Sequence, residues 1–166
     1  LVISRAKTSL SPVETETQRL LEAYETALSE QDLHDYDDLL CKSYDLLKAD
    51  EAKRPNYSYV LVDEFQDTSE LQYELLKLLG GSQNIFAIGD PNQSIYGWRG
   101  AGAEMFGRFR ADFPNVQEID LTENYRSRRG IIRLANAIFP DSPQLIAQTK
   151  ELGKVQALQT LNEYSE

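Results

Sequence analysis

Two short apolar runs, separated by a helical stretch, constrain the fold of this chain most strongly. Residues 59–62 read Tyr-Val-Leu-Val, and residues 85–88 read Ile-Phe-Ala-Ile. Continuous apolar runs of this length are typical of strands that are buried on both faces, as in parallel sheets. Between the runs, leucines recur at helical spacing until Gly80 and Gly81. The pattern predicts an α/β fold in which a helix connects two parallel, buried strands.

Helical periodicity predicts the elements on either side of these strands. Apolar positions three and four residues apart from Val13 to Ala49 predict two amphipathic helices, with a break near residues 29–34. After the second strand, residues 103–113 are expected to form a helix and residues 116–121 a third strand. The predicted core order is therefore βαβαβ, preceded by a helical segment.

The last part of the chain is predicted to contain a break. A helix is expected over residues 128–139, and the prolines within residues 140–143 mark a loop or linker. Residues 155–161 are interpreted as one more strand, which lies beyond the break and belongs to a second, truncated domain.

Composition is that of an ordinary soluble protein. The 166 residues are 41% hydrophobic, no apolar run is long enough to span a bilayer, and no leader opens the sequence. We therefore expect a cytoplasmic protein with no membrane partner. The first residue is Leu1 and not methionine, so we expect either excision from a longer polypeptide or processing of the chain. The single Cys41 and the single His34 cannot build a disulfide or a zinc site, so a buried thiol and a surface histidine are expected.

The net charge of −10 argues against a nucleic-acid partner only as an average over the chain. Residues 1–75 hold 17 acidic and 7 basic side chains, whereas residues 76–166 hold 10 of each. Seven arginines lie between positions 99 and 133. Local positive charge in the second half is therefore compatible with contact to phosphate.

Polar side chains follow each of the three predicted strands. The sequences are DEFQD at 63–67, GDPNQ at 89–93 and TENYR at 122–126. Ligands of open α/β sheets bind at the carboxyl ends of the strands, so chemistry is expected there. The adjacent carboxylates of Asp63 and Glu64 suit phosphoryl transfer, in which one acid holds Mg²⁺ and its neighbour orients or deprotonates water. The alternative is that these two acids cap the following helix.

Longer motifs around these strand ends resemble those of superfamily 1 DNA helicases of the UvrD/Rep/PcrA type. The motifs are VDEFQDT at 62–68, similar to Walker B; GDPNQSIYGWRGA at 89–101, similar to the third motif; LTENYRS at 121–127, similar to the fourth; and DYDDLL at 35–40, similar to the helix before Walker B. The resemblance runs from about Leu20 to Phe139, and the motifs keep their order and spacing. The chain is thus identified as a fragment that spans Walker B to motif IV.

The resemblance implies a fold and a domain organisation. The fold is part of a parallel-sheet, RecA-like P-loop NTPase core with flanking N-terminal helices. The implied domains are 1–54, the helical part of an inserted subdomain and the lead-in to the core; 55–126, the C-terminal part of the first RecA-like ATPase domain; and 127–166, a linker helix and the truncated start of the second RecA-like domain.

The resemblance also implies roles in ATP binding and hydrolysis. Asp63 is similar to the aspartate that coordinates Mg²⁺, and Glu64 to the base that activates water. Gln93 resembles the glutamine that contacts the γ-phosphate and reports its presence to the DNA site. Tyr125 resembles the tyrosine that stacks on adenine. ATP and Mg²⁺ are the implied cofactors.

Arg126 resembles the arginine finger of these helicases, which reaches the γ-phosphate across the cleft between two RecA-like domains. The planar, permanently charged guanidinium suits the spread-out charge of phosphoryl transfer. The alternative is a surface ion pair with Glu123.

Trp98 is the predicted DNA-stacking residue. Because Gly97 and Gly100 flank it closely, it has little to pack against and is expected to be exposed. An exposed indole offers any base a face for stacking, and Arg99 beside it can meet a phosphate. By resemblance, Trp98, Tyr96 and Arg99 form the DNA-binding set, and single-stranded DNA is the partner. The alternative is a tryptophan that closes the hydrophobic core.

The sequence contains no Gly-x-x-x-x-Gly-Lys-Ser/Thr phosphate loop. We therefore expect a parent enzyme that couples ATP hydrolysis to movement along single-stranded DNA and duplex unwinding, in DNA repair or replication. The fragment alone, without the missing remainder of the helicase, is expected to be inactive. Two alternatives remain: the helicase part of an AddA/RecB-type helicase-nuclease, and a truncated, non-catalytic module that binds DNA or a partner.

Overall fold

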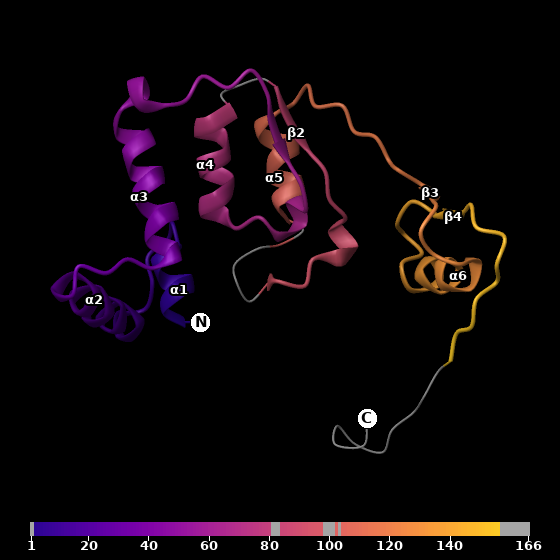
Figure 1. Cartoon of the computed structure of the whole chain (residues 1–166), viewed down its shortest axis with the longest axis horizontal. Helices are drawn as coiled ribbons and strands as arrows, with labels where there is room; N and C mark the ends of the chain where they lie inside the picture. The colour runs from indigo at the N-terminus through magenta and orange to yellow at the C-terminus, as the bar shows by residue number, and fades with distance from the viewer. Residues whose placement is uncertain (1, 81–83, 98–101, 103, 157–166) are drawn as a thin grey trace, which may run out of the picture. The chain divides into compact units, whose positions relative to one another are not determined.

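The computed structural model describes residues 2–80, 84–97, 102 and 104–156, and it divides the chain into two compact units (Figure 1). Unit 1 comprises residues 1–116 and unit 2 residues 117–166. The elements of unit 1 are α1 (Val2–Lys7), α2 (Thr15–Glu30), α3 (Tyr36–Ala49), β1 (Val60–Val62), α4 (Glu70–Gly80), β2 (Ile85–Ala87) and α5 (Glu104–Asp112), with short 3-10 turns at Glu51–Lys53, Phe65–Asp67 and Pro91–Gln93. In unit 2 they are β3 (Glu123–Asn124), α6 (Arg129–Ile138) and β4 (Ile146–Ala147).

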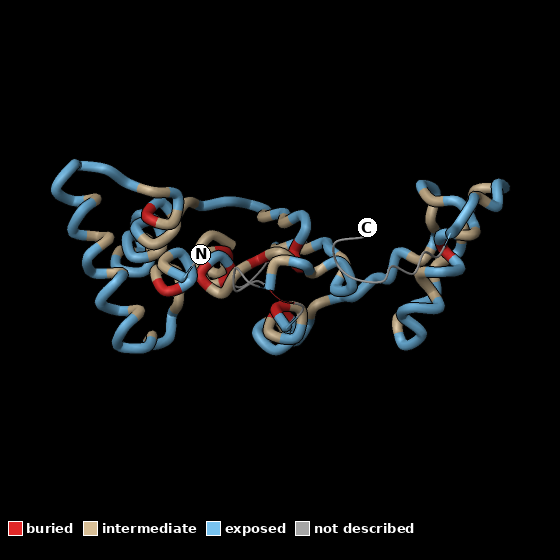
Figure 2. The backbone as a smooth tube through the Cα atoms, turned by 90° about the horizontal axis from the view of Figure 1, so that it is seen from below, coloured by how far each residue is buried: buried red, intermediate tan, exposed pale blue. Residues whose placement is uncertain are grey.

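The predicted helices are confirmed, and local sequence signals explain their ends. α2 and α3 are separated at residues 31–35, within one residue or two of the expected break. α3 starts with a capping box, because the Asp35 carboxylate accepts from the Asp38 amide and the Asp38 carboxylate accepts from the Asp35 amide. α2 has no buried residue, and Figure 2 colours most of its residues as exposed. None of the described helices is long and apolar enough to cross a membrane.

A buried lysine ties α1 to α2 and α3. The Lys7 side chain is only 6% exposed, and its Nζ pairs with Glu25 of α2 and with Asp38 of α3, 2.9 Å away. Burial lowers the pKa of Lys7, but the hydrogen bonds to the carboxylates outweigh burial and the pKa is raised. Cys41 of α3 is half-buried and not fully buried, with its Sγ 3.5 Å from the Lys7 carbonyl oxygen. His34 is exposed, as predicted.

β1 and β2 form a parallel two-stranded sheet with α4 as the connection, which confirms the α/β class. Val60, Val62, Ile85 and Ala87 pack against the core. The buried core residues come from the turn after β1, from α4 and from α5: Phe65, Tyr73, Leu76, Met105 and Phe109. α4 also contacts α3 on its other side (Figure 1).

The opposite face of the sheet differs from the prediction. Leu61 of β1 is 75% exposed, and its register partner Phe86 of β2 is 56% exposed. The prediction that both faces are buried is therefore wrong for the described part of the chain, because α4 and α5 supply apolar side chains to one face only.

The predicted third strand is also wrong. Residues 116–121 form no strand, and Ile119 and Leu121 are exposed. The next strand is β3, which pairs in parallel with β4 in unit 2 and leaves β1 and β2 as a separate sheet. The two compact units of the structure meet at 116/117.

The break predicted at residues 140–143 is a loop within unit 2. It connects α6 to β4 and is closed by Asn136, whose side chain donates to the Leu145 carbonyl and accepts from the Leu145 amide, both at 3.0 Å. Residues 155 and 156 form no strand, and the remainder of the strand predicted at 155–161 lies outside the described residues.

Candidate functional site

The chain turns sharply after β1, and this turn presents two neighbouring carboxylates. Glu64 adopts a left-handed conformation with φ 50°, after which residues 65–67 form a 3-10 turn. Backbone hydrogen bonds of 2.9 Å from Ile88 to Val62 and from Phe65 to Ile88 hold the turn against the end of β2. Asp63 and Glu64 are both exposed. The strand end therefore offers two acids to solvent on a firmly attached backbone.

The alternative that these acids cap the next helix is not supported by the geometry. The Asp63 carboxylate accepts from the Glu64 amide at 2.9 Å, and the Glu64 side chain makes no capping hydrogen bond. The start of α4 is capped by Ser69 and Gln72, whose side chains each accept from the other residue's amide. The carboxylates are thus not used to cap α4.

A buried glutamine connects Glu64 to the loop after β2. Gln66 is 2% exposed, and its Nε2 donates to Glu64 Oε2 at 2.8 Å. Its Oε1 accepts from the Asp90 amide at 3.0 Å. Sequence reasoning did not single out Gln66, because its partner Asp90 lies 24 residues away.

The loop after β2 holds Gln93 through Asp90. The Asp90 carboxylate accepts from the Asn92 amide at 2.9 Å and from Gln93 Nε2 at 2.8 Å. Gln93 is exposed. The structure therefore brings two of the predicted residues, Glu64 and Gln93, into one hydrogen-bonded path through Gln66 and Asp90.

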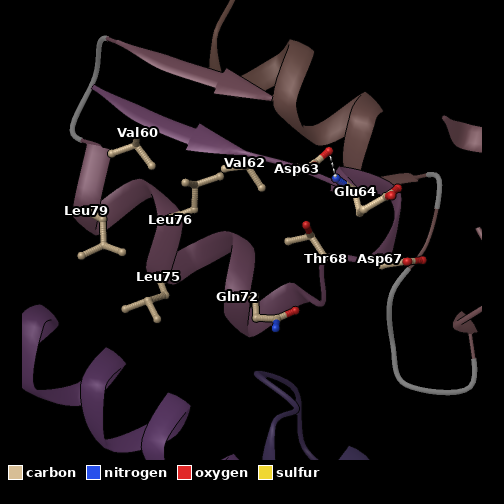
Figure 3. A pocket seen from close by; sticks show the side chains of 10 residues that line it. All are labelled: Val60, Val62, Asp63, Glu64, Asp67, Thr68, Gln72, Leu75, Leu76 and Leu79. Atoms are coloured by element: carbon tan, nitrogen blue, oxygen red, sulfur yellow. Dashed lines mark hydrogen bonds between the residues drawn. The ribbon is translucent and has the colours of Figure 1, made fainter. Parts of the chain in front are cut away.

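A groove of about 440 Å³ lies between β1 and α4 and ends at the carboxylates. Figure 3 shows its lining: Val60 and Val62 of β1 and Leu75, Leu76 and Leu79 of α4 along the apolar part, and Asp63, Glu64, Asp67, Thr68 and Gln72 at the polar end. The polar side chains that line this groove therefore lie at the end where the carboxylates are.

The residues at the strand end fit a Mg²⁺ ion that is held largely by other ligands. Among the described residues, no group of three or more His, Cys, Asp or Glu side chains could hold a metal ion. Mg²⁺ commonly binds to one or two carboxylates and takes its other ligands from water and phosphate oxygens. The exposed pair of Asp63 and Glu64 matches this arrangement.

The predicted DNA-binding residues lie at the end of the described loop. Tyr96 is half-buried, and Gly97 is the last residue described before the gap at residues 98–101. Trp98 and Arg99 lie outside the described residues, so their stacking and phosphate contacts stay predictions.

In unit 2 a short turn carries Tyr125 and Arg126, both exposed. The Asn124 side chain accepts from the amides of Arg126 at 3.1 Å and Ser127 at 2.7 Å, which fixes the turn. The Tyr125 hydroxyl donates to the Glu123 carboxylate, and this hydrogen bond raises the pKa of Tyr125. Within the described part of the chain, Arg126 makes no ion pair with Glu123, the alternative considered for it.

Comparison with known proteins gives consistent matches. Residues 3–114 match the family described as UvrD/REP helicase N-terminal domain. A probable DNA helicase of Mycoplasma pneumoniae is 44% identical over 124 residues, which cover 72% of this chain and 23% of that protein. DNA helicase II of Escherichia coli is 39% identical over 137 residues (80% and 19%), and ATP-dependent DNA helicase Rep of Escherichia coli is 38% identical over 150 residues (86% and 22%). The chain thus spans about a fifth of the length of these curated relatives.

Proposed function

Because the chain belongs to the UvrD/REP helicase family, we propose that it is part of an ATP-dependent DNA helicase. In this proposal the complete enzyme couples ATP hydrolysis to movement along single-stranded DNA and to duplex separation, and β1, α4 and β2 belong to a RecA-like core. The observation that carries the proposal is the strand end of unit 1, where Asp63 and Glu64 are both exposed and Glu64 is linked by hydrogen bonds through Gln66 to the loop that holds Gln93.

The two carboxylates have different proposed roles. Asp63 would hold Mg²⁺, which when bound neutralises phosphate charge. The Glu64 carboxylate would accept the proton of the water that attacks the γ-phosphate, which requires a carboxylate held at hydrogen-bond distance from that water. Exposure of both acids at the strand end and the backbone bonds that fix the turn support a shared site for the pair, and the division of roles follows the resemblance to the helicase motif.

The remaining groups are proposed to bind phosphate, base and DNA. Gln93 would hydrogen-bond the γ-phosphate, and its attachment to Asp90 gives it a defined position. Arg126 would stabilise phosphoryl charge, and Tyr125 would stack on adenine; the exposure of both side chains is what these roles require. Trp98, Tyr96 and Arg99 would contact single-stranded DNA.

Replacing Glu64 tests the proposal in the complete helicase that contains this chain. Glu64→Gln keeps the shape of the side chain but removes its basicity, so DNA-stimulated ATP hydrolysis should be lost while nucleotide affinity stays near wild type. Glu30→Gln, an exposed change at the end of α2, is the matched control and should leave turnover unchanged. DNA-stimulated phosphate release that survives in Glu64→Gln would exclude Glu64 as the base.

A further inference from the structure

We propose that Gln66 is a positioning residue that orients the Glu64 carboxylate and couples it to the loop carrying Gln93. The inference rests on the proposed function and deepens it, because it states how the water-activating acid is held and what can move it. Gln66 itself would touch neither nucleotide nor water, since it is 2% exposed and lies beneath the strand end.

The two hydrogen bonds fix the orientation of the Gln66 amide. An amide N–H can only donate, so the Asp90 amide must face the side-chain oxygen of Gln66, at 3.0 Å. The side-chain nitrogen is then directed to Glu64 Oε2, at 2.8 Å, where only a donor fits beside a carboxylate. Because Gln66 is buried, water cannot readily replace the Asp90 amide or the Glu64 carboxylate as its hydrogen-bond partner. Turning the Gln66 amide to break one of these hydrogen bonds would therefore break the other as well.

The loop after β2 approaches Gln66 closely at two further points. A Cβ added at Gly89 would lie 2.4 Å from Gln66 Oε1 and 2.9 Å from the Phe65 amide nitrogen, so only glycine allows this approach. The Ser94 hydroxyl donates to the Gln66 carbonyl at 3.3 Å. The loop is therefore attached to Gln66 at both its ends.

This arrangement has a mechanical consequence. Gln93 is bonded to the Asp90 carboxylate, and the Asp90 amide is bonded to Gln66, so a shift of the loop that moves Asp90 also rotates or releases the Gln66 amide. Glu64 then loses the donor that holds one of its two oxygens. Binding events sensed by the loop would thereby change how well Glu64 is aimed.

Two substitutions at Gln66 separate positioning from mere packing, with DNA-stimulated ATP turnover of the complete helicase as the readout. Gln66→Met keeps the volume but removes both hydrogen bonds, so kcat should fall about 10- to 100-fold, the range typical of a misplaced catalytic group, with KM for ATP unchanged. Gln66→Glu keeps the acceptor for Asp90 and can donate to Glu64 only when the introduced carboxyl is protonated.

Gln66→Glu should therefore be rescued by acid. Among the described residues, the carboxylates on the segments bonded to Gln66 are Asp63, Glu64, Asp67 and Asp90, and the loop also carries the hydroxyl of Tyr96. Because position 66 is buried beside these carboxylates, we expect the pKa of the introduced carboxyl to lie above the ordinary value of about 4.3. Its turnover relative to wild type should rise at least about threefold between pH of about 8 and about 6, whereas the ratio for Gln66→Met should stay flat.

Gln18→Glu is the matched control. Gln18 also donates its Nε2 to a glutamate, Glu22, at 2.9 Å, but on the exposed face of α2. Its turnover and pH profile should follow wild type. Wild-type kcat in both Gln66 variants, or a loss in Gln66→Glu that is the same at every pH, would overturn the inference. A wild-type helicase without DNA-stimulated turnover would overturn the proposed function instead.

Discussion

The two units present their candidate functional residues in different ways. In unit 1, Glu64 is held through its own side chain by a buried residue, Gln66, which is in turn bonded to a loop 24 residues away. In unit 2, the turn with Tyr125 and Arg126 is fixed through its backbone amides by the neighbouring Asn124, while the Arg126 side chain is exposed. In the proposed function, unit 1 therefore has its acid positioned before the reaction, whereas the position of the Arg126 guanidinium in unit 2 would depend on the phosphate that it binds.

This difference matters for catalysis because a base must be aimed before reaction, whereas a cation can act by stabilising charge that develops later. A preformed hydrogen-bond network costs nothing to organise at the moment of reaction. An exposed arginine loses rotamer freedom when it engages phosphate, which makes its contribution depend on that engagement. Variants in each unit should therefore affect different quantities.

The largest effect is expected from Arg126 in unit 2. In the complete helicase, Arg126→Ala should lower DNA-stimulated ATP turnover about 10³-fold or more while DNA affinity changes little, because the guanidinium acts on transition-state charge. Arg126→Lys should be a poor substitute, since it keeps the charge but loses the planar fork. Arg133→Ala, also exposed, is the control in phosphate-release and DNA-binding assays. If Arg126→Ala hydrolysed ATP about as fast as Arg133→Ala, Arg126 would have no catalytic role.

A smaller effect on stability is expected from Gly89 in unit 1. Gly89→Ala forces a Cβ to within 2.4 Å of Gln66 Oε1 and should destabilise the folded chain by about 1–3 kcal/mol. Gly107→Ala is the matched control, because a Cβ added at Gly107 meets nothing within 4 Å. Gly107 lies in α5, and within a helix alanine is more stable than glycine by about 0.5–1 kcal/mol. Urea unfolding of the chain measures both. Equal stability of the two variants would show that the loop is not held tightly against Gln66.

The smallest effect is expected from Asn124 in unit 2. Asn124→Ala removes the acceptor of the Arg126 and Ser127 amides and should cost about 1 kcal/mol, as for other side-chain caps. Asn115→Ala, at an exposed position outside the turn, serves as the reference. If urea unfolding showed that Asn124→Ala lowers the free energy of unfolding more than Gly89→Ala does, the turn in unit 2 would be held more firmly than the loop in unit 1.

The sequence predicted those parts of the fold that depend on local signals. The helices were predicted because periodic apolar residues act within one element. The capping box of Asp35 at the start of α3, which the structure shows, is an equally local signal. The run at residues 59–62 identified β1, but an apolar run alone does not reveal whether a second layer covers Leu61. The third strand was misplaced because β3 consists of two polar residues whose pairing is decided by β4, far along the chain.

The sequence also predicted only some of the residues at the candidate site. Asp63 and Glu64 were predicted because they directly follow an apolar strand, whereas Gln93 was predicted from the resemblance to a helicase motif. The structure joins Glu64 to Gln93 through Gln66 and Asp90, and the roles of all three stay predictions. Gln66 was not predicted as a site residue. Its burial and its hydrogen bond to the Asp90 amide, on which its proposed role rests, cannot be inferred from the neighbouring sequence.

The parallel pairing of β1 with β2 also bears on the order in which the molecule folds. Two parallel strands cannot zip together from a tight turn, because the connecting segment, here including α4, must first carry the chain back to the starting edge. Contacts between residues distant in sequence form late, since loop closure has to be completed before they contribute. We expect the hydrogen bond between the Asp90 amide and Gln66, which joins residues 24 positions apart, to form after the helices, so that Glu64 becomes aligned only once the two strands have paired.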